Sequence, residues 1–162
     1  MPQLSKTDLF ELVEQFTTNI EDRLVTPHIQ KTIEIGFVNV LPQTLINALV
    51  ALDLTSGGTE LKAFWNDYFK QVWAYKSYVR FFTWHGNNIT QFGLVNISDD
   101  STQRISDKVR GELISNIESD LAVYHQRMMN RLTEVNYTFD SVVYTKIEVI
   151  RKPTNRFKIR GI

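Results

Sequence analysis

The stretch that decides the fold is Thr59–Phe82, TELKAFWNDYFKQVWAYKSYVRFF, which follows the pair Gly57-Gly58. Glycine interrupts regular structure and threonine is an acceptable N-cap, so we expect a helix to begin at Thr59. Apolar residues then recur at alternating steps of four and three, the spacing of one helical face. They are Leu61, Trp65, Tyr68, Val72, Tyr75, Val79 and Phe82, widened by Phe64, Phe69 and Trp73. The residues expected on the opposite, exposed face are Asn66, Lys70, Ser77 and Arg80.

This helix is unusually aromatic. Burying one aromatic side chain removes roughly 150–250 Å² from water, so most of the rings are expected in the core. Tryptophan and tyrosine are also favoured anchors of protein interfaces, and there are more rings than one face of a small bundle needs. We therefore expect some of the set Trp73, Tyr78, Phe81 and Trp84 to contact another subunit. The sequence His85-Gly86-Asn87-Asn88 should end the helix.

A second long helix is predicted over residues 102–134. Candidate N-caps precede it at Asp99, Asp100 and Ser101. Its apolar stripe comprises Ile105, Val109, Leu113, Ile117, Leu121, Tyr124, Met128 and Leu132. About 30 helical residues would span about 45 Å. Between the helices, Ile89–Ser98 is β-prone and contains Gly93, which indicates an extended turn or a small hairpin. The predicted skeleton is an elongated helical hairpin.

Three stretches carry a family resemblance: Trp73–Arg80 (WAYKSYVR), Gln91–Val95 (QFGLV) and the helix from Thr102 to Leu132. Together they resemble the head–tail connector proteins of tailed bacteriophages, also called neck, adaptor or ring proteins, and most nearly the ring proteins of crAss-like phages. The resemblance covers the middle half of the chain well and the ends loosely.

The resemblance implies a structural virion protein rather than an enzyme. It would be made in the host cytoplasm and form a homo-oligomeric ring of twelve copies in the phage neck. That ring would join the portal protein to further neck or tail proteins, with DNA passing through its lumen without sequence-specific binding. The contact residues expected on this basis are Trp73, Tyr78, Trp84, Gln91, Phe92, Gly93, Leu94, Arg127, Arg131, Arg151, Lys152, Arg156, Phe157, Lys158, Ile159 and Arg160.

The composition fits one globular domain, with 43% hydrophobic and 22% charged residues in 162. The sequence contains no cysteine, which excludes disulfides and thiolate metal sites. The N-terminus MPQLSKTDLF has no basic region followed by an apolar run, so we expect no secretory signal. The most apolar run, Leu45–Leu54, is too short to span a bilayer, and no membrane partner is expected.

Charge is distributed unevenly along a chain whose formal net charge is zero. Residues 1–60 hold three Lys/Arg and eight Asp/Glu, residues 61–134 hold nine and eight, and residues 135–162 hold six and two. An acidic front and a basic rear could pair between neighbours in a head-to-tail ring. Ordinary solubilising charges would leave the same pattern.

Shorter elements are predicted before the hairpin. A first helix should begin at Ser5 or Thr7, and its buried face is Leu9, Val13, Phe16, Ile20 and Leu24. A second should begin at Thr26-Pro27 and continue to about Val40. The apolar segment Gln43–Asp53 is predicted as a buried helix, although a core strand has the same signature.

After Glu134 the period changes to that of a strand, with Tyr137, Phe139, Val143, Ile147 and Val149 on one side. The predicted division is therefore a helical domain over residues 1–134 and an extended arm over residues 135–162. The arm ends in the basic and apolar segment Pro153–Ile162. It could add a strand to a neighbouring chain or to the portal, or complete a small sheet of its own domain.

No constellation for catalysis, cofactor binding or metal binding is visible. His28, His85 and His125 lie in separate elements, Asp99-Asp100 fits helix capping better than a Ca²⁺ loop, and nucleotide-binding glycine motifs are absent. Glu112 and Glu118 are expected at exposed helix positions. The pair Arg127 and Arg131 indicates either a solvated face or a site for an acidic partner. The alternative functions are a nucleic-acid-binding regulator using residues 102–134 and the basic end, or an enzyme with a site assembled across helices.

Overall fold

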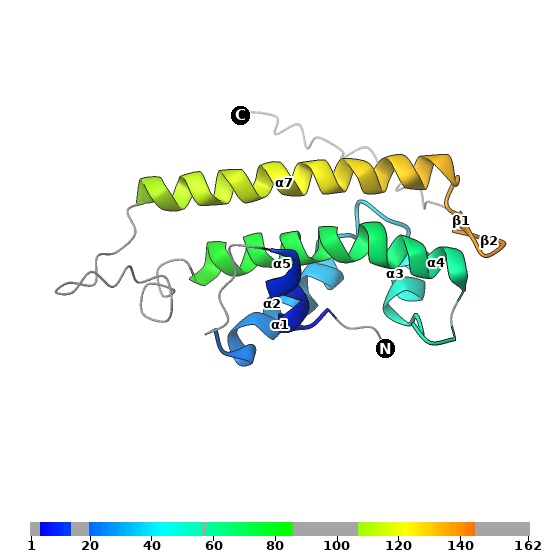
Figure 1. Cartoon of the computed structure of the whole chain (residues 1–162), viewed down its shortest axis with the longest axis horizontal. Helices are drawn as coiled ribbons and strands as arrows, with labels where there is room; N and C mark the ends of the chain where they lie inside the picture. Colours follow the sequence, from blue (N-terminus) through cyan, green and yellow to red (C-terminus); the bar gives the residue numbers. More distant parts are fainter. Residues whose placement is uncertain (1–3, 14–19, 57, 86–106, 145–162) are drawn as a thin grey trace, which may run out of the picture.

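The computed structural model of the chain describes residues 4–13, 20–56, 58–85 and 107–144 (Figure 1). The helices described are α1 (Lys6–Leu12), α2 (Asp22–Ile35), α3 (Gln43–Val50), α4 (Thr59–Phe64), the π-helical η1 (Trp65–Phe69), α5 (Lys70–His85) and α7 (Asp107–Glu134). The strands described are β1 (Thr138–Phe139) and β2 (Val142–Val143). The fold is mainly α with a small β element, and this confirms the predicted fold class.

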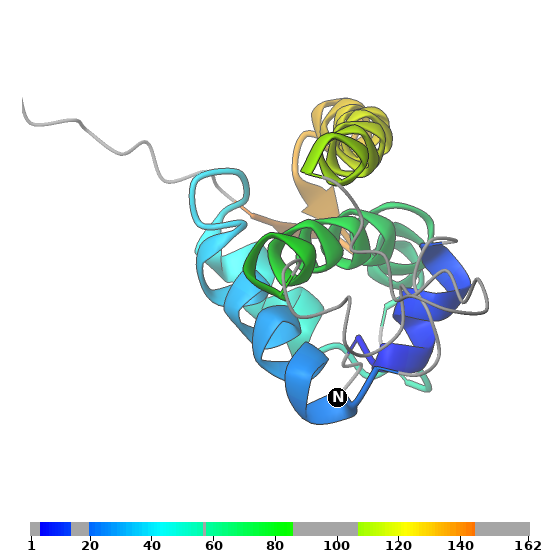
Figure 2. The same cartoon turned by 90° about the vertical axis from the view of Figure 1, so that its left-hand side faces the viewer.

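The central element is the continuous helix made by α4, η1 and α5. It lies between α1 and α2 on one side and α7 on the other (Figure 2). Its aromatic side chains fill the core, and those at most 3% exposed are Phe64, Trp65, Phe69, Trp73, Tyr78, Phe81 and Phe82. Phe69 occupies the centre, with its ring centroid 4.9 Å from that of Phe37 and 5.3 Å from that of Trp65.

The predicted polar face of this helix was partly wrong. Asn66 is exposed as expected, but Ser77 is only 1% exposed. Lys70 is largely covered and pairs with Asp8 at 2.5 Å, which joins α5 to α1. A helix covered on two sides retains no continuous solvent face, so a small hydroxyl residue can be buried in it. The wider π turn η1 had no sequence signal.

Helix α7 packs along α5 and completes the predicted helical hairpin (Figures 1 and 2). Ile117, Met128 and Leu132 are at most 1% exposed, and the rings of Tyr75 and Tyr124 lie 5.0 Å apart. The predicted end at Glu134 is confirmed. Residues 102–106, the expected N-caps at 99–101 and the segment 89–98 lie outside the described residues.

Helix α7 ends in a Schellman motif. The Tyr137 backbone N–H donates to the Leu132 carbonyl at 3.0 Å, and the Asn136 N–H donates to the Thr133 carbonyl at 3.2 Å. Asn136 has φ 47°, the left-handed conformation that this motif requires and that asparagine tolerates better than most residues. The chain therefore turns sharply after α7 and returns to the start of α4.

The predicted single strand after Glu134 was wrong, because the chain reverses at Asp140-Ser141. Strands β1 and β2 pair antiparallel, with Thr138 opposite Val143 and Phe139 opposite Val142. Asp140 and Ser141 have φ 47° and 67°, so both central residues adopt the conformation of a type I′ hairpin turn. Phe139 is buried against Phe64, at 4.8 Å between ring centroids, while Val143 on β2 is 63% exposed. Residues 145–162 lie outside the described part.

Ser141→Gly is expected to stabilise the protein by about 0.5 kcal/mol. The left-handed conformation costs a non-glycine residue roughly 1–2 kcal/mol, and glycine avoids this cost. The greater freedom of glycine in the unfolded chain cancels about 0.4–1 kcal/mol of that gain. The measurement is urea unfolding followed by circular dichroism. Ser119→Gly, on the exposed side of α7, is the matched control and should destabilise by about 0.5–1 kcal/mol. Equal signs for the two variants would contradict the turn assignment.

The tip of this hairpin caps α4. The Asp140 carboxylate accepts from the Glu60 and Leu61 backbone N–H groups, each at 3.1 Å, and the Glu60 carboxylate accepts from the Asp140 N–H at 2.6 Å. The expectation that Thr59 is the N-cap was wrong: Gly58 occupies that position, and Asp140 supplies the capping oxygens from 80 residues away. Residues 135–144 therefore pack with the helices rather than starting a separate arm, which places the predicted boundary at 134/135 inside the packed unit.

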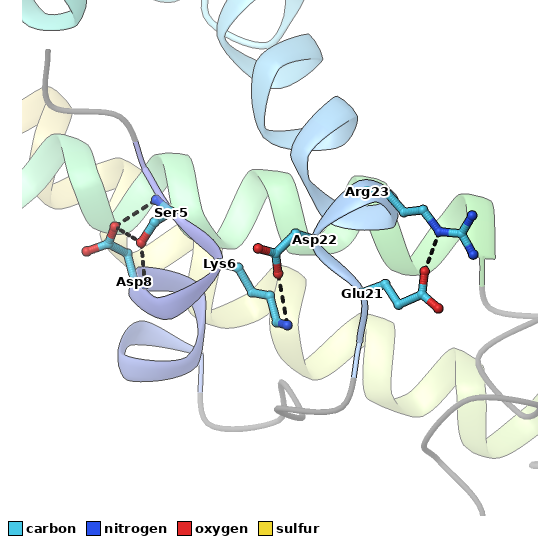
Figure 3. Close-up of polar contacts among 6 residues, drawn as sticks. All are labelled: Ser5, Lys6, Asp8, Glu21, Asp22 and Arg23. Atoms are coloured by element: carbon cyan, nitrogen blue, oxygen red, sulfur yellow. Dashed lines mark hydrogen bonds and ion pairs between the residues drawn. The ribbon is translucent and has the colours of Figure 1, made fainter.

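Helix α1 begins as predicted, with Ser5 as its N-cap. Ser5 and Asp8 form a capping box: the Asp8 N–H donates to Ser5 Oγ at 3.2 Å and the Ser5 N–H donates to the Asp8 carboxylate at 2.7 Å (Figure 3). The prediction of one helix through Leu24 was wrong, because α1 ends at Leu12 and Val13 is extended. Val13 and Ile20 are nevertheless buried, so the apolar period persists although the helix does not. Phe16 lies outside the described residues.

Helix α2 begins at Asp22, before the predicted start at Thr26-Pro27, and Pro27 lies inside it. Lys6 of α1 pairs with Asp22 at 3.0 Å, which ties the two helix starts together (Figure 3). Proline has no backbone N–H, so Pro27 leaves the helix one hydrogen bond short. The burial of Val25 in the turn before it offsets that loss. The helix ends at Ile35 rather than near Val40, since Phe37 turns into the core.

Helix α3 confirms the helical alternative for Gln43–Asp53, although it ends at Val50. Leu45, Ile46 and Leu49 are buried, while Gln43 and Asn47 lie on the exposed side. After α3 the chain passes through Asp53 and Leu54 to the start of α4.

Candidate functional site: a basic groove beside Trp84

A cavity of about 340 Å³ lies between the C-terminal end of α2, one side of α5 and α7. We call it the basic groove, and its lining residues are Thr32, Ile35, Gly36, Lys76, Val79, Arg80, Thr83, Trp84 and Leu121. Lys76, Val79, Arg80 and Thr83 recur at steps of three and four, so helical geometry places them on one side of α5. Helix α2 supplies one wall and Leu121 of α7 the other.

The rim of the basic groove is apolar. Trp84, near the end of α5, is 68% exposed, and Ile35, the last residue of α2, is 50% exposed. Trp84 is therefore the one tryptophan of the chain on the surface, because Trp65 and Trp73 are at most 3% exposed. An exposed indole next to an exposed isoleucine is a surface suited to a partner with apolar side chains.

Lys76 lies within the groove, and its ammonium group makes two contacts. Its Nζ donates to the Gly36 carbonyl at 2.8 Å and lies 4.9 Å from the centroid of the Phe37 ring. Burial lowers the pKa of its ammonium below the ordinary 10.5. The hydrogen bond also satisfies a carbonyl at the C-terminus of α2, where a positive charge is favourable.

Arg80 follows Lys76 by one helical turn and contributes the second positive charge. Its Nε is buried and has no hydrogen-bond partner among the described residues. The ion pairs found in the described part of the chain are Lys6–Asp22, Arg23–Glu21, Lys31–Glu34, Lys70–Asp8, Lys108–Glu112 and Arg131–Glu134. Neither Lys76 nor Arg80 is among them, so the groove presents two cations that no described carboxylate neutralises.

His125 of α7 adds a titratable group beside this pair. Burial lowers the pKa of the imidazole below the ordinary 6.5, and the charge of Lys76 lowers it further. Protonating His125 would place a third positive charge between α5 and α7. The folded helical hairpin is therefore more stable with His125 neutral than with His125 protonated.

Acidification is expected to lower the free energy of unfolding of the protein, because His125 lies between the two long helices. The unfolded chain binds this proton more readily than the folded one, so the contribution of His125 is fully present above pH 6.5 and is lost as the pH falls below it. His125→Gln should flatten that part of the stability profile. Urea unfolding of both proteins at about pH 7.5 and about pH 5.5 measures the difference. An unchanged slope in the variant would rule out His125 as the group responsible.

Of the contact residues expected from the sequence, some are buried in the core and others are exposed. Trp73 and Tyr78 are each 3% exposed, so the expectation that they contact another subunit is corrected: they are core residues. The Trp73 Nε1–H donates to the Ile29 carbonyl at 3.0 Å, and burial raises the pKa of Tyr78 to about 12. Phe81, 1% exposed, is likewise interior.

Arg127 and Arg131 lie on the exposed side of α7. Arg131 pairs with Glu134 at 3.3 Å, and the Arg127 guanidinium lies 5.8 Å from the centroid of the Tyr124 ring. These contacts favour the solvated-face interpretation of the pair. Residues Gln91–Leu94 and the basic tail from Arg151 to Arg160 lie outside the described residues, so their contacts stay predictions.

A second cavity, of about 480 Å³, lies beside the β-hairpin and is lined by Glu60, Arg131, Val135, Thr138, Phe139, Asp140 and Ser141. Its carboxylates are engaged in capping α4, and Arg131 is paired. The residues around this cavity thus connect the β-hairpin to helices α4 and α7.

The described residues contain no group of three or more His, Asp or Glu side chains placed to hold a metal ion. Glu112 and Glu118 are exposed on α7, as the sequence predicted. Within the same ranges, none of the helices has both the length and the apolar character needed to cross a membrane.

Sequence reasoning missed Lys76, Arg80 and Ile35 as a group. It assigned Arg80 to an exposed face and gave Lys76 no role. The available signal was two cations one turn apart on a helix that is otherwise aromatic. The position of α2, which forms the opposite wall, depends on tertiary packing and had no local signature.

Comparison with known proteins identifies a family whose activity is not known. No curated protein and no solved structure matches the chain. Residues 37–146, more than half of the chain, match one family pattern. They hold the helical hairpin, the β-hairpin and the α5 and α7 sides of the basic groove, whereas Thr32, Ile35 and Gly36 of the groove precede them. The chain belongs to DUF6712, a family of unknown function.

Proposed function

We propose that the chain is a structural subunit that assembles into a ring in the neck of a tailed phage. The ring joins the portal protein to further neck or tail proteins and leaves a channel for DNA. The phage setting rests on the resemblance of WAYKSYVR, QFGLV and the second long helix to head–tail connectors. The assembly itself is supported by the exposed Trp84, which is the observation that carries the proposal.

The exposure of Trp84 is costly for a subunit that works alone. About two thirds of its side chain faces water, at 68% exposure. Burying the exposed part of an indole, about 130 Å² at about 25 cal/mol per Å², would contribute about 3 kcal/mol to an association. Trp84 lies beside Ile35 and the groove cations, so a contact there combines apolar burial with charge pairing.

Helix α7 supplies a second surface for assembly. It packs on α5 through one side, while its outer side is exposed and includes Val123 at 51% exposure. A long helix with one side uncovered offers an extended surface to a neighbouring subunit. Its four basic and five acidic residues give no basic stripe, and this counts against the alternative of a nucleic-acid-binding regulator.

The test is reconstitution with the portal protein of the same phage. Mass photometry and negative-stain imaging should show rings of this chain bound to the portal, with twelve copies in each ring. Trp84→Ala should lose assembly while its circular dichroism stays that of the wild type, because Trp84 is outside the core. Trp65→Phe, a conservative change in the core, is the matched control and should still assemble.

A wild-type chain that stays monomeric in the presence of portal would refute the proposal. Filter binding separates the alternative function, since a nucleic-acid-binding regulator would bind DNA at micromolar or lower concentrations and lose affinity steeply with added salt. Such binding without assembly would favour the regulator.

A further inference from the structure

The turn between α3 and α4 presents an acid next to an exposed apolar side chain. It comprises Asp53, Leu54, Thr55 and Ser56, and we call it the Asp53 turn. Asp53 Oδ1 accepts from the Thr55 N–H at 2.9 Å and from Thr55 Oγ1 at 2.7 Å, and the Ser56 hydroxyl donates to Oδ2. These local bonds fix the shape of the turn, while Leu54 is 44% exposed.

Asp53 carries its negative charge at every ordinary pH. The Ser56 hydroxyl, followed by the two Thr55 donors, holds the pKa of the Asp53 carboxyl well below its usual range. No ion pair in the described part of the chain involves Asp53. The turn therefore offers an unneutralised carboxylate and a leucine side by side.

The basic groove has the complementary chemistry. Arg80 and Lys76 are cations without a described carboxylate partner. Ile35 and Trp84 supply the exposed apolar surface beside them. A carboxylate and an adjoining aliphatic side chain from another surface match both features.

These two surfaces cannot meet within one molecule. The Asp53 turn precedes α4, and Trp84 lies near the end of α5, at the other end of the same continuous helix (Figure 1). From Gly58 to Trp84 the helical rise of about 1.5 Å per residue gives a separation of about 40 Å. The match therefore requires a second molecule.

We propose that the Asp53 turn of one copy docks in the basic groove of the next copy, with Asp53 against Arg80 and Leu54 against Ile35 and Trp84. This inference rests on the self-assembly proposed above and identifies its contact. Two different surfaces at opposite ends of one chain form a heterologous contact, which is the type that generates rings. The acidic excess of residues 1–60, eight Asp/Glu against three Lys/Arg, has the sign that such a head-to-tail contact needs.

The chain contains no cysteine, so disulfide trapping between engineered positions can test the contact directly. Leu54→Cys and Ile35→Cys are prepared as separate proteins, and both positions are exposed enough to leave the fold intact. Assembled on portal and oxidised, the mixture should give a disulfide-linked dimer containing one of each protein. Each variant alone should give at most one tenth of that yield. Homodimers of equal yield would overturn the head-to-tail contact.

Charge reversal supplies the second measurement. Arg80→Glu should raise the concentration needed for ring assembly at least tenfold, and Asp53→Lys should do the same. The double variant Asp53→Lys, Arg80→Glu should recover assembly, since the pair is restored with its signs exchanged. Arg23→Glu, an exposed arginine at the start of α2 outside the groove, is the control and should assemble as the wild type does. Circular dichroism checks that every variant is folded.

The outcomes separate this inference from the proposed function. Normal assembly of Arg80→Glu, together with no mixed disulfide, overturns the docking contact and leaves the ring proposal standing. Failure of the wild type to assemble on portal overturns the ring proposal and, with it, the contact that depends on it. Loss of assembly in both single variants without recovery in the double variant overturns the direct pairing of Asp53 with Arg80.

Discussion

Phe69→Ala is expected to destabilise the protein by about 3–5 kcal/mol, the largest effect of any single change considered. Phe69 is fully buried, and its ring centroid lies within 6 Å of those of Phe37, Trp65 and Trp73. Removing the ring leaves a cavity bounded by other large rings, and these cannot collapse into it without leaving their own contacts. The free energy of unfolding, from urea titration followed at the helical circular dichroism band, measures the loss.

Two controls make this prediction specific. Phe69→Leu keeps much of the volume and should cost less than half as much as the alanine variant. Asn66→Ala changes an exposed position on the same π turn and should stay within about 0.5 kcal/mol of the wild type. A loss below about 1 kcal/mol for Phe69→Ala would show that the aromatic cluster is not the centre of the core.

Gly58→Ala is expected to destabilise the protein by about 1–2 kcal/mol, the range reported for losing a helix N-cap. A Cβ at this position would lie 1.9 Å from Asp140 Oδ2, so the carboxylate would have to leave the backbone N–H groups of Glu60 and Leu61. The backbone itself is no obstacle, since Gly58 has φ −57° and alanine adopts that value readily. The cost therefore lies in the lost cap rather than in strain at residue 58.

A double-mutant cycle tests this explanation. Asp140→Gly removes the carboxylate and suits the positive φ of the turn. In that background Gly58→Ala should cost less than about 0.3 kcal/mol, because nothing remains for the methyl group to displace. An equal cost in both backgrounds would refute the capping role of Asp140. Chemical denaturation of the four proteins under identical conditions gives the coupling free energy.

Local sequence patterns were sufficient for the long helices. The apolar period from Leu61 to Phe82 and from Leu113 to Leu132 coincides with buried or partly buried positions in the structure. A helix of several turns repeats its signal often enough to be read without knowledge of its neighbours. The same period misled at the N-terminus, where Leu9, Val13 and Ile20 are buried although the helix ends at Leu12. Burial depends on the assembled core, so residues from two separate segments can be buried at the spacing of a single helix.

Contacts across long sequence separations were beyond local reasoning. The capping of α4 by Asp140 joins residues 80 apart, and the basic groove joins α2 to α5 and α7. The type I′ turn was missed because Asp-Ser is a weaker signal than the Asn-Gly or Asp-Gly pair. Ser77 was assigned to solvent because its polarity was weighed without the helices that cover it.

The aromatic residues show the same limit for function. Their number suggested intersubunit contacts for Trp73, Tyr78 and Trp84, yet Trp73 and Tyr78 are interior and Trp84 is exposed. The distinction depends on which side of α5 is covered by α2 and α7. The helix sequence alone does not state this, because its aromatic residues occur on every side.

The reciprocal bonds between Glu60 and Asp140 also bear on the order in which this chain folds as it is synthesised. The N-terminal half of the central helix leaves the ribosome some 80 residues before the carboxylate that completes its first turn. Closing a loop of that length is entropically costly, and contacts between distant residues slow folding. The first turn of α4 is thus completed among the last native contacts, after α7 has returned the chain to its starting end.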